Sequence, residues 1–191
     1  MPRSKRPNRD GRRRLPPPRQ ATAAAAHPLA PVTLGIKSHE FIGGLLGTGL
    51  REAATTEIAR LAGVAVDRDL CITHRQATRA RLRTDAHIYF RHFAPTAAWT
   101  LVGWEVRAGS CRLDLVWRDE AGRVWADELK TGRFTKLDQG VSAQVERQLE
   151  GGARRWGPAF AGVRLCLFGA PNESPALTPA GHRLSGSQFP R

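Results

Sequence analysis

The sequence predicts an α/β sandwich with a mixed central sheet of about four to five strands flanked by helices. Three observations support this prediction. An apolar stripe at helical spacing comes first, then a run of short extended segments joined by turns, and then an amphipathic segment followed by one more extended segment. Elements in this order pack as layers around one core, and 191 residues are enough for one such domain.

The predicted domain occupies residues 34–170. Residues 1–33 are expected to form a disordered basic arm, because they are rich in Pro, Arg and Ala and contain almost no large apolar side chains. Residues 171–191 are rich in Pro, Gly and Ser, and we predict that they form a flexible C-terminal tail.

The first helix is predicted over residues 45–61. Its apolar residues recur at spacings of three and four, which is the stripe of a helix packed on a core; they are Leu46, Leu50, Ala54, Ile58 and Leu61. Residues 72–84 are basic and fit either a helix or a loop. Residues 87–92 place aromatic side chains among basic ones, and we expect a strand packed on the core there.

The middle of the chain predicts a meander of three strands. Residues 100–106 and 111–118 are extended segments joined by a short turn, and residues 119–122 form the turn before the strand at 123–130. A helix is then predicted over residues 137–156 and a last strand over 163–169. The apolar face of that helix comprises Val141, Val145, Leu149 and Trp156.

The composition points to a polyanionic partner. The formal net charge is +13 and the sequence pI is about 11.3, so nucleic acid, DNA in the first instance, is the expected partner. The basic arm is either a leader without a role or a segment that attracts phosphates. A further set of arginines is expected to bind phosphates without reading bases: Arg75, Arg79, Arg81 and Arg83.

Asp114, Glu128 and Lys130 interrupt strands that are otherwise apolar. Side chains alternate faces along a strand, so Glu128 and Lys130 point to one side, and the hairpin returns the Asp114 strand beside them. Such charges are costly to bury unless an ion or an ion pair compensates them. Two carboxylates on adjacent strands suit Mg²⁺ or Mn²⁺. The alternatives are a solvated strand face for Glu128 and Lys130, or a simple pair of Asp114 with Lys130.

This segment resembles the core motif of the PD-(D/E)XK nuclease superfamily, in which an Asp on one strand precedes (Asp/Glu)-x-Lys on the next. Asp114, Glu128 and Lys130 match those positions, and Leu113 stands in place of the Pro. Residues 128–132 (Glu-Leu-Lys-Thr-Gly) are similar to the RecB-like branch of that family. The resemblance covers roughly residues 38–170.

The resemblance implies a restriction-endonuclease-like fold and a site for Mg²⁺ or Mn²⁺. Asp114, Glu128 and the backbone carbonyl of Leu129 would hold the metal, and Lys130 would orient the attacking water and stabilise negative charge. The RecB-like branch also carries Gln-x-x-x-Tyr on the following helix. Gln144 and Gln148 have that spacing here, with Gln in place of Tyr. They are expected to position the lysine, the water or the DNA backbone; otherwise they are plain polar positions.

The family implies a further acid from the first helix. Glu57 lies about 40° from the centre of the apolar stripe, at ~100° per residue, so it is the candidate for a catalytic and metal-supporting acid. Glu40 is a weaker candidate. The alternative for Glu57 is a surface ion pair with Arg60 or Arg51.

Other polar residues are interpreted as ordinary. Asp127 faces away from Glu128 and is predicted to be structural. The histidines show no metal-ligand spacing; those concerned are His39, His74, His87 and His92.

The sequence therefore predicts a metal-dependent nuclease that hydrolyses phosphodiester bonds of DNA. It also predicts a cytoplasmic protein, because no apolar run approaches the ~18 residues of a membrane span and the three cysteines form no pair. One alternative is a catalytically inactive nuclease-fold protein that binds nucleic acid. Another is an interaction module whose basic segments bind RNA or an acidic protein. The oligomeric state stays open.

Overall fold

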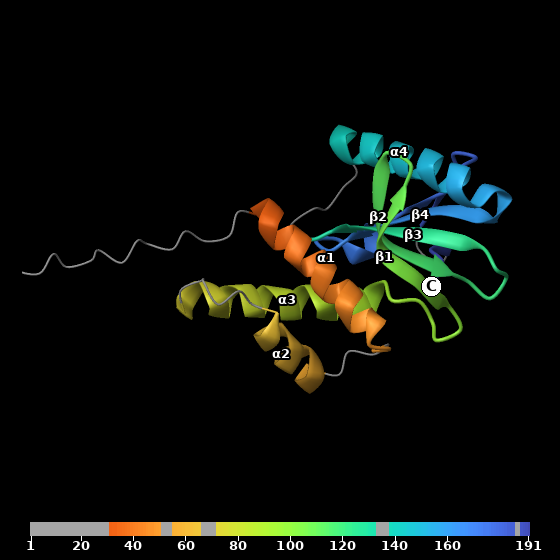
Figure 1. Ribbon diagram of the computed structural model, residues 1–191. Helices are drawn as coiled ribbons and strands as arrows, with labels where there is room; N and C mark the ends of the chain where they lie inside the picture. The colour runs from red at the N-terminus through yellow and green to blue at the C-terminus, as the bar shows by residue number, and fades with distance from the viewer. Residues whose placement is uncertain (1–30, 51–54, 66–71, 133–137, 186–187) are drawn as a thin grey trace, which may run out of the picture.

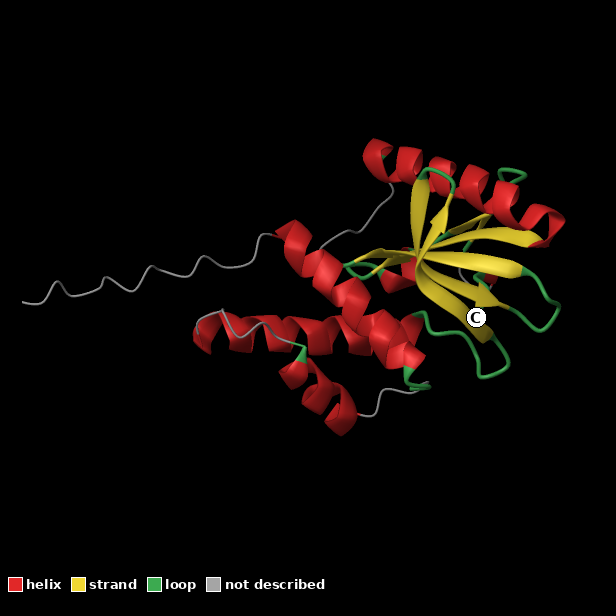
Figure 2. Cartoon of the chain, in the orientation of Figure 1, coloured by secondary structure: helices red, strands yellow, loops and turns green. Residues whose placement is uncertain are grey.

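The protein is an α/β sandwich in which helices cover both faces of a mixed six-stranded sheet (Figures 1 and 2). The computed structural model describes residues 31–50, 55–65, 72–132, 138–185 and 188–191. The helices are α1 (Pro31–Gly47), α2 (Thr55–Val64), α3 (Ile72–His92) and α4 (Gln139–Trp156), and the strands are β1 (Thr100–Ala108), β2 (Cys111–Arg118), β3 (Val124–Lys130), β4 (Phe160–Leu167), β5 (Ala176–Leu177) and β6 (Arg183–Leu184). The predicted α/β sandwich with a mixed central sheet is confirmed, but the sheet has six strands rather than the predicted four to five, because the short strands β5 and β6 extend it.

The strands lie in the sheet in chain order. The predicted meander of β1, β2 and β3 is antiparallel, and α4 connects β3 to β4 so that these two run parallel. The remaining strands continue the sheet, with β5 antiparallel to β4 and β6 antiparallel to β5. Among the described helices, none combines the length and the apolar character that crossing a membrane would require.

Each face of the sheet has its own hydrophobic core. On β3, Trp125 and Leu129 belong to the core shared with α1, α2 and α3, whereas Val124 and Ala126 belong to the core shared with α4. This regular alternation places Asp127 toward the first core and Glu128 toward α4. Asp127 is thus on the opposite face from Glu128, as predicted.

Strand β1 changes faces at Glu105. Trp104 lies against Gly43 and Gly47 of α1, but Val106, two residues further on, packs against the core on the α4 side. Residues two apart normally share a face. Here Glu105 has a φ of 54°, the only positive φ of a non-glycine residue in the described chain, and it turns the strand over.

The paired strand β2 makes the same change at Asp114. Leu115 packs in the α1 core and Leu113 in the α4 core, and they pair with Trp104 and Val106 respectively. The tip of the hairpin is thereby carried over to α4, as Figure 1 shows. Asp114 and Glu105 consequently lie where the hairpin changes direction.

The predicted first helix, residues 45–61, is wrong. Helix α1 ends at Gly47, α2 begins at Thr55, and part of the predicted span lies outside the described residues. The break follows from Gly49, whose φ of 85° ends the first helix. The stripe therefore combined residues of two different helices, with Leu46 on α1 and Ile58 on α2.

Helix α1 also begins earlier than the predicted domain. Its first residue is Pro31, and the fixed φ of proline suits the first turn of a helix. The predicted arm, residues 1–33, therefore overlaps this helix, and residues 1–30 lie outside the described residues.

Residues 72–92 form one helix, so the open choice at 72–84 is resolved as helix and the strand predicted at 87–92 is wrong. Leu82, Ala86, Tyr89 and Phe93 are buried at spacings of four, three and four. The aromatic residues therefore continue a helical apolar face rather than an alternating strand.

The C-terminal residues pack onto the sheet, which corrects the predicted flexible tail at 171–191. Strand β5 pairs with β4, and Phe189 is buried in the α1 core. The guanidinium of Arg164 donates a hydrogen bond of 2.7 Å to the carbonyl of Pro190. Two-residue strands are too short to produce a periodic pattern, which is why the sequence did not indicate them.

A buried ion pair joins the centre of the sheet. Arg164 and Asp127 are both fully buried, and the guanidinium donates to the carboxylate at 2.6 and 2.7 Å. The Tyr89 hydroxyl and the Trp117 indole nitrogen donate to the same carboxylate at 2.7 and 3.0 Å. Every partner is satisfied, so the network fixes β2, β3, β4 and α3 relative to one another.

Replacing Asp127 tests this network. Asp127→Ala would leave the buried charge of Arg164 uncompensated, so the free energy of unfolding should fall by about 3–5 kcal/mol. Urea unfolding followed by circular dichroism measures the change. Glu150→Ala, which breaks the exposed pair with Arg154, is the control and should change stability by about 0.5 kcal/mol or less. Equal effects of the two variants would contradict the assigned role.

Candidate metal and phosphate site

Most of the predicted site residues line a cavity of about 480 Å³ between α1, α3 and the ends of β2 and β3. Its wall combines acidic, basic and apolar side chains. The lining residues are Leu34, Gly35, Ile36, His39, Arg81, Arg112, Asp114, Glu128, Leu129, Lys130, Thr131, Gly132 and Gln144.

Asp114 occupies the place where β2 separates from β3. The paired register of the two strands ends at Leu115 and Asp127, so Asp114 has no cross-strand backbone partner on β3. Its carboxylate oxygen Oδ2 instead accepts the backbone N–H of Leu129 at 2.8 Å. The side chain thus substitutes for a ladder hydrogen bond and is held at the gap between the strands.

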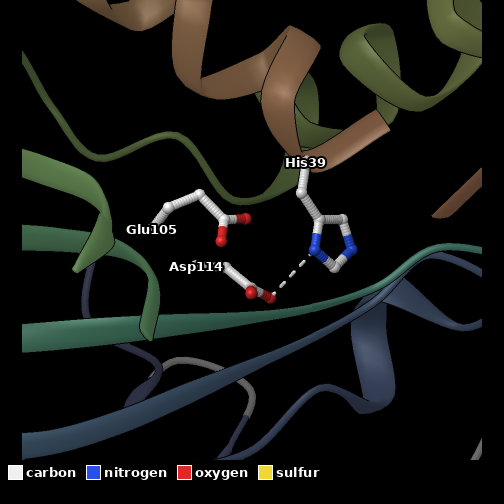
Figure 3. A group of neighbouring side chains, drawn as sticks. All are labelled: His39, Glu105 and Asp114. Atoms are coloured by element: carbon white, nitrogen blue, oxygen red, sulfur yellow. Dashed lines mark ion pairs between the residues drawn. The ribbon is translucent and has the colours of Figure 1, made fainter. Parts of the chain in front are cut away.

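Three potential metal ligands converge at this gap (Figure 3). Asp114, Glu105 of β1 and His39 of α1 each offer one ligand atom, and these atoms lie within 4.8 Å of one another. The Nδ1 atom of His39 is 3.3 Å from Asp114 Oδ2. Figure 3 shows the imidazole and both carboxylates directed toward one another from separate elements.

Glu105 is the least satisfied member of this group. The Nε atom of Arg112 lies 2.5 Å from its Oε2, yet neither carboxylate oxygen has an aligned hydrogen-bond donor among the described residues. Burial raises the pKa of Glu105, and repulsion by Asp114 raises it further. A carboxylate in this condition is suited to a cation, since a cation would supply the missing compensation.

The negative charges of the group also raise the pKa of His39, whereas burial has the opposite effect on it. Burial acts to lower its pKa, but the hydrogen bond to Asp114 and the charges of Asp114, Glu128 and Glu105 outweigh burial and raise it. When His39 is protonated, its imidazolium compensates part of the negative charge of the group. An imidazole and two carboxylates form a ligand set that Mn²⁺ fits at least as well as Mg²⁺.

Glu128 lies behind this group and is held by two glutamines of α4. Gln144 donates to one carboxylate oxygen at 2.8 Å, and Gln148 donates to the other at 2.5 Å. Lys130 lies 2.7 Å from the first oxygen. Burial raises the pKa of Glu128, and Asp114 raises it further, while Lys130 opposes the shift.

Lys130 lies on the same face of β3 as Glu128, as predicted. Its ammonium group donates to Gln144 Oε1 at 2.7 Å in addition to its contact with Glu128. Gln144 therefore bridges the two charged residues with both ends of its amide. The structure brings together Asp114, Glu128, Lys130, Gln144 and Leu129 around one cavity, with Gln148 directly behind Glu128.

Glu57 does not join this site, which corrects its prediction as a supporting acid. It lies on α2, where Arg60 donates to both of its carboxylate oxygens at 2.9 and 2.6 Å. That hydrogen bond, and to a lesser degree the charge of Arg60, lowers the pKa of Glu57. Glu57 was expected near the site because residues 45–61 were predicted to form one continuous helix. The break at Gly49 divides that helix, so the expected position of Glu57 no longer follows.

His39 and Glu105 are the residues that sequence reasoning missed. His39 comes from a helix distant in sequence from Asp114, so no local ligand spacing could reveal it. Glu105 reaches the group because of its positive φ, which alternation along a strand cannot indicate. Its position opposite Asp114 in the predicted hairpin was the one available signal.

No model of a known protein family matches the chain, and no curated protein or solved structure matches it.

The raised pKa of Glu105 predicts a pH-dependent gain in stability for Glu105→Gln. The folded state holds this proton more tightly than the unfolded state, so the charge of Glu105 opposes folding at pH above its raised pKa. In metal-free buffer the variant should have a higher Tm than the native protein at pH 8. The difference should vanish as the pH falls toward about 4, where the group is protonated in both states.

Thermal unfolding at a series of pH values measures this effect. Glu120→Gln makes the same chemical change at an exposed turn position and should shift the Tm by about 2 °C or less. A lower Tm for Glu105→Gln at pH 8 would mean that its pair with Arg112 outweighs the repulsion by Asp114.

Proposed function

We propose that the chain is a metal-dependent nuclease that hydrolyses phosphodiester bonds of DNA, with a restriction-endonuclease-like fold and a site of the PD-(D/E)XK type. One observation carries the proposal. A cluster of carboxylates and an imidazole lies in the same cavity as a lysine and two arginines. Anionic substrates that react at a metal centre need this combination of ligands and cations.

The donor set fits a divalent cation. Asp114, Glu105 and His39 would hold it, with Glu128 adjacent on the next strand. A cation bound there lowers the pKa of a coordinated water and compensates charge on phosphate oxygens. The carbonyl of Leu129, expected from the resemblance as a further ligand, remains a prediction.

Lys130 supplies a fixed positive charge next to this group. Its ammonium group has three donors, and Glu128 and Gln144 engage it on one side. A remaining donor can bind the attacking water or a phosphate oxygen on which negative charge develops. Gln144 fixes the orientation of the ammonium group because it is itself anchored to Glu128.

Gln148 orients Glu128 from the other side. Its amide nitrogen donates to Glu128 and also to the carbonyl of Arg112 in the hairpin tip, at 3.0 Å. It therefore joins β2, β3 and α4 at the site. We assign Gln148 a positioning role, because it lies behind the carboxylate rather than in the cavity.

A second candidate function is a nucleic-acid-binding protein without catalysis. It is favoured by the complete satisfaction of Glu128, since both oxygens already have donors among the described residues. In a non-catalytic protein, the acidic and basic groups of the site would only stabilise one another. The unsatisfied oxygens of Glu105 favour the nuclease over this alternative.

Cleavage assays test the catalytic proposal. The purified protein should digest DNA with Mg²⁺ or Mn²⁺ and lose this activity with a chelator. Lys130→Ala should reduce the rate by about 10²–10³, because it removes the cation that stabilises developing charge. Glu146→Gln, on the exposed face of α4, is the control and should retain full activity. Undiminished cleavage by Lys130→Ala would refute the assignment.

Metal binding provides a test that does not depend on activity. Calorimetric titration with Mn²⁺ should show one or more sites, and Asp114→Asn should weaken the affinity about tenfold or more. Glu146→Gln should again bind as the native protein does. If Mn²⁺ binds equally to the native protein and to Asp114→Asn, the ligand group is not the metal site, and the non-catalytic alternative is favoured.

A further inference from the structure

The four arginines of α3 that the sequence places together are not equivalent in the structure. Arg79 and Arg83 are exposed on the outer surface of the helix, whereas Arg81 is half-buried and lines the cavity with Asp114, Glu128 and Lys130. Arg81 is two residues from each of them, so about half a turn of helix separates surface cations from a cation inside the candidate site.

Arg81 is held by a buried carboxylate. Its Nε atom donates to both oxygens of Asp85, at 2.7 and 2.8 Å, and Asp85 is 1% exposed. The hydroxyl of Ser38, which is fully buried, donates to the same carboxylate at 2.7 Å. A side chain fixed in this way loses little conformational freedom when it binds a ligand.

The anchoring uses only the Nε edge of the guanidinium. No described residue accepts a hydrogen bond from the two terminal nitrogens of Arg81, and 34% of the side chain is exposed. A guanidinium presents its donors as a planar fork that matches two oxygens of a phosphate. The free edge of Arg81 is thus prepared for an anion with two acceptor atoms.

The Arg81 fork and the ligand group are connected through helix α1. Ser38, which holds Asp85, is adjacent in α1 to His39, which contacts Asp114. The fork and the ligand group are therefore anchored to neighbouring residues of one helix, but they lie on different elements, α3 and the β1–β2 hairpin. Because Arg81, His39 and Asp114 line the same cavity, one bound strand can contact both the fork and the ligand group.

We infer that the terminal edge of Arg81 binds a phosphate of the strand whose reacting phosphodiester lies at the carboxylate and imidazole group. Asp85 and Ser38 are its positioning residues. This inference rests on the proposed function for the identity of the strand as nucleic acid. The contact reads no base, because only phosphate oxygens engage the fork.

The test measures binding of a twelve-residue oligothymidylate in the presence of a chelator, so that neither metal nor cleavage contributes. Each phosphate contact in single-stranded DNA contributes about 0.7 to the slope of log K against log salt. Arg81→Gln should reduce this slope by about 0.7 and weaken the affinity about tenfold at low salt. The control Arg154→Gln, on the exposed face of α4, should leave both values nearly unchanged.

A second variant distinguishes loss of the phosphate contact from a folding defect caused by leaving Asp85 without its cation. Arg81→Lys retains a charge that can pair with Asp85, but its single ammonium group cannot also form the fork, so it should bind as weakly as Arg81→Gln. Binding by Arg81→Lys equal to the native protein, or equal losses for Arg81→Gln and Arg154→Gln, would overturn the site. Because no step of this test requires hydrolysis, its failure is distinguishable from failure of the cleavage assay.

Discussion

The change of faces in the β1–β2 hairpin is the constraint on which the site depends. Where Glu105 and Asp114 turn the two strands over, β2 leaves β3, and the carboxylate of Asp114 takes the place of a backbone acceptor for Leu129. An ordinary flat hairpin would continue the ladder and leave no space between the strands. The positive φ of Glu105 costs of order 1 kcal/mol. The hairpin tip is held in its turned position by α4, through Gln148 and the carbonyl of Arg112.

Strand β3 separates two kinds of buried polar chemistry by alternation alone. Asp127, directed toward α3, is fully compensated by Arg164, Tyr89 and Trp117. Glu128, the next residue, is directed toward α4 and shares its cavity with the candidate metal ligands. Rigid compensation on one face supports a cluster on the other in which Glu105 has no aligned hydrogen-bond donor among the described residues, an arrangement expected where binding sites are built on stable elements.

The sequence predicted the half of the fold in which periodicity is regular. Strands β1 to β4, helix α4, the shared face of Glu128 and Lys130, and the opposite face of Asp127 all follow from alternation or helical spacing. The helices before β1 were predicted poorly, because Gly49 divides a stripe that looks continuous in one dimension. The same error misplaced Glu57, and it left His39 outside the predicted first helix. Glu105 was missed for a different reason, since its role depends on a backbone dihedral angle that residue type does not reveal.

Ser38 and His39 are consecutive residues of α1, and they are bound to different partners, Asp85 on α3 and Asp114 on β2. Successive side chains on an α-helix are separated by about 100° around its axis. Two such contacts fix both the rotation of the helix about its axis and its position along that axis. Trp104, seated against Gly43 and Gly47, adds a third point of attachment that admits no larger residue without a clash. Helix α1 is therefore held in one orientation, and the distance between its histidine and the carboxylates opposite is set by the frame of the protein rather than by the flexibility of a side chain.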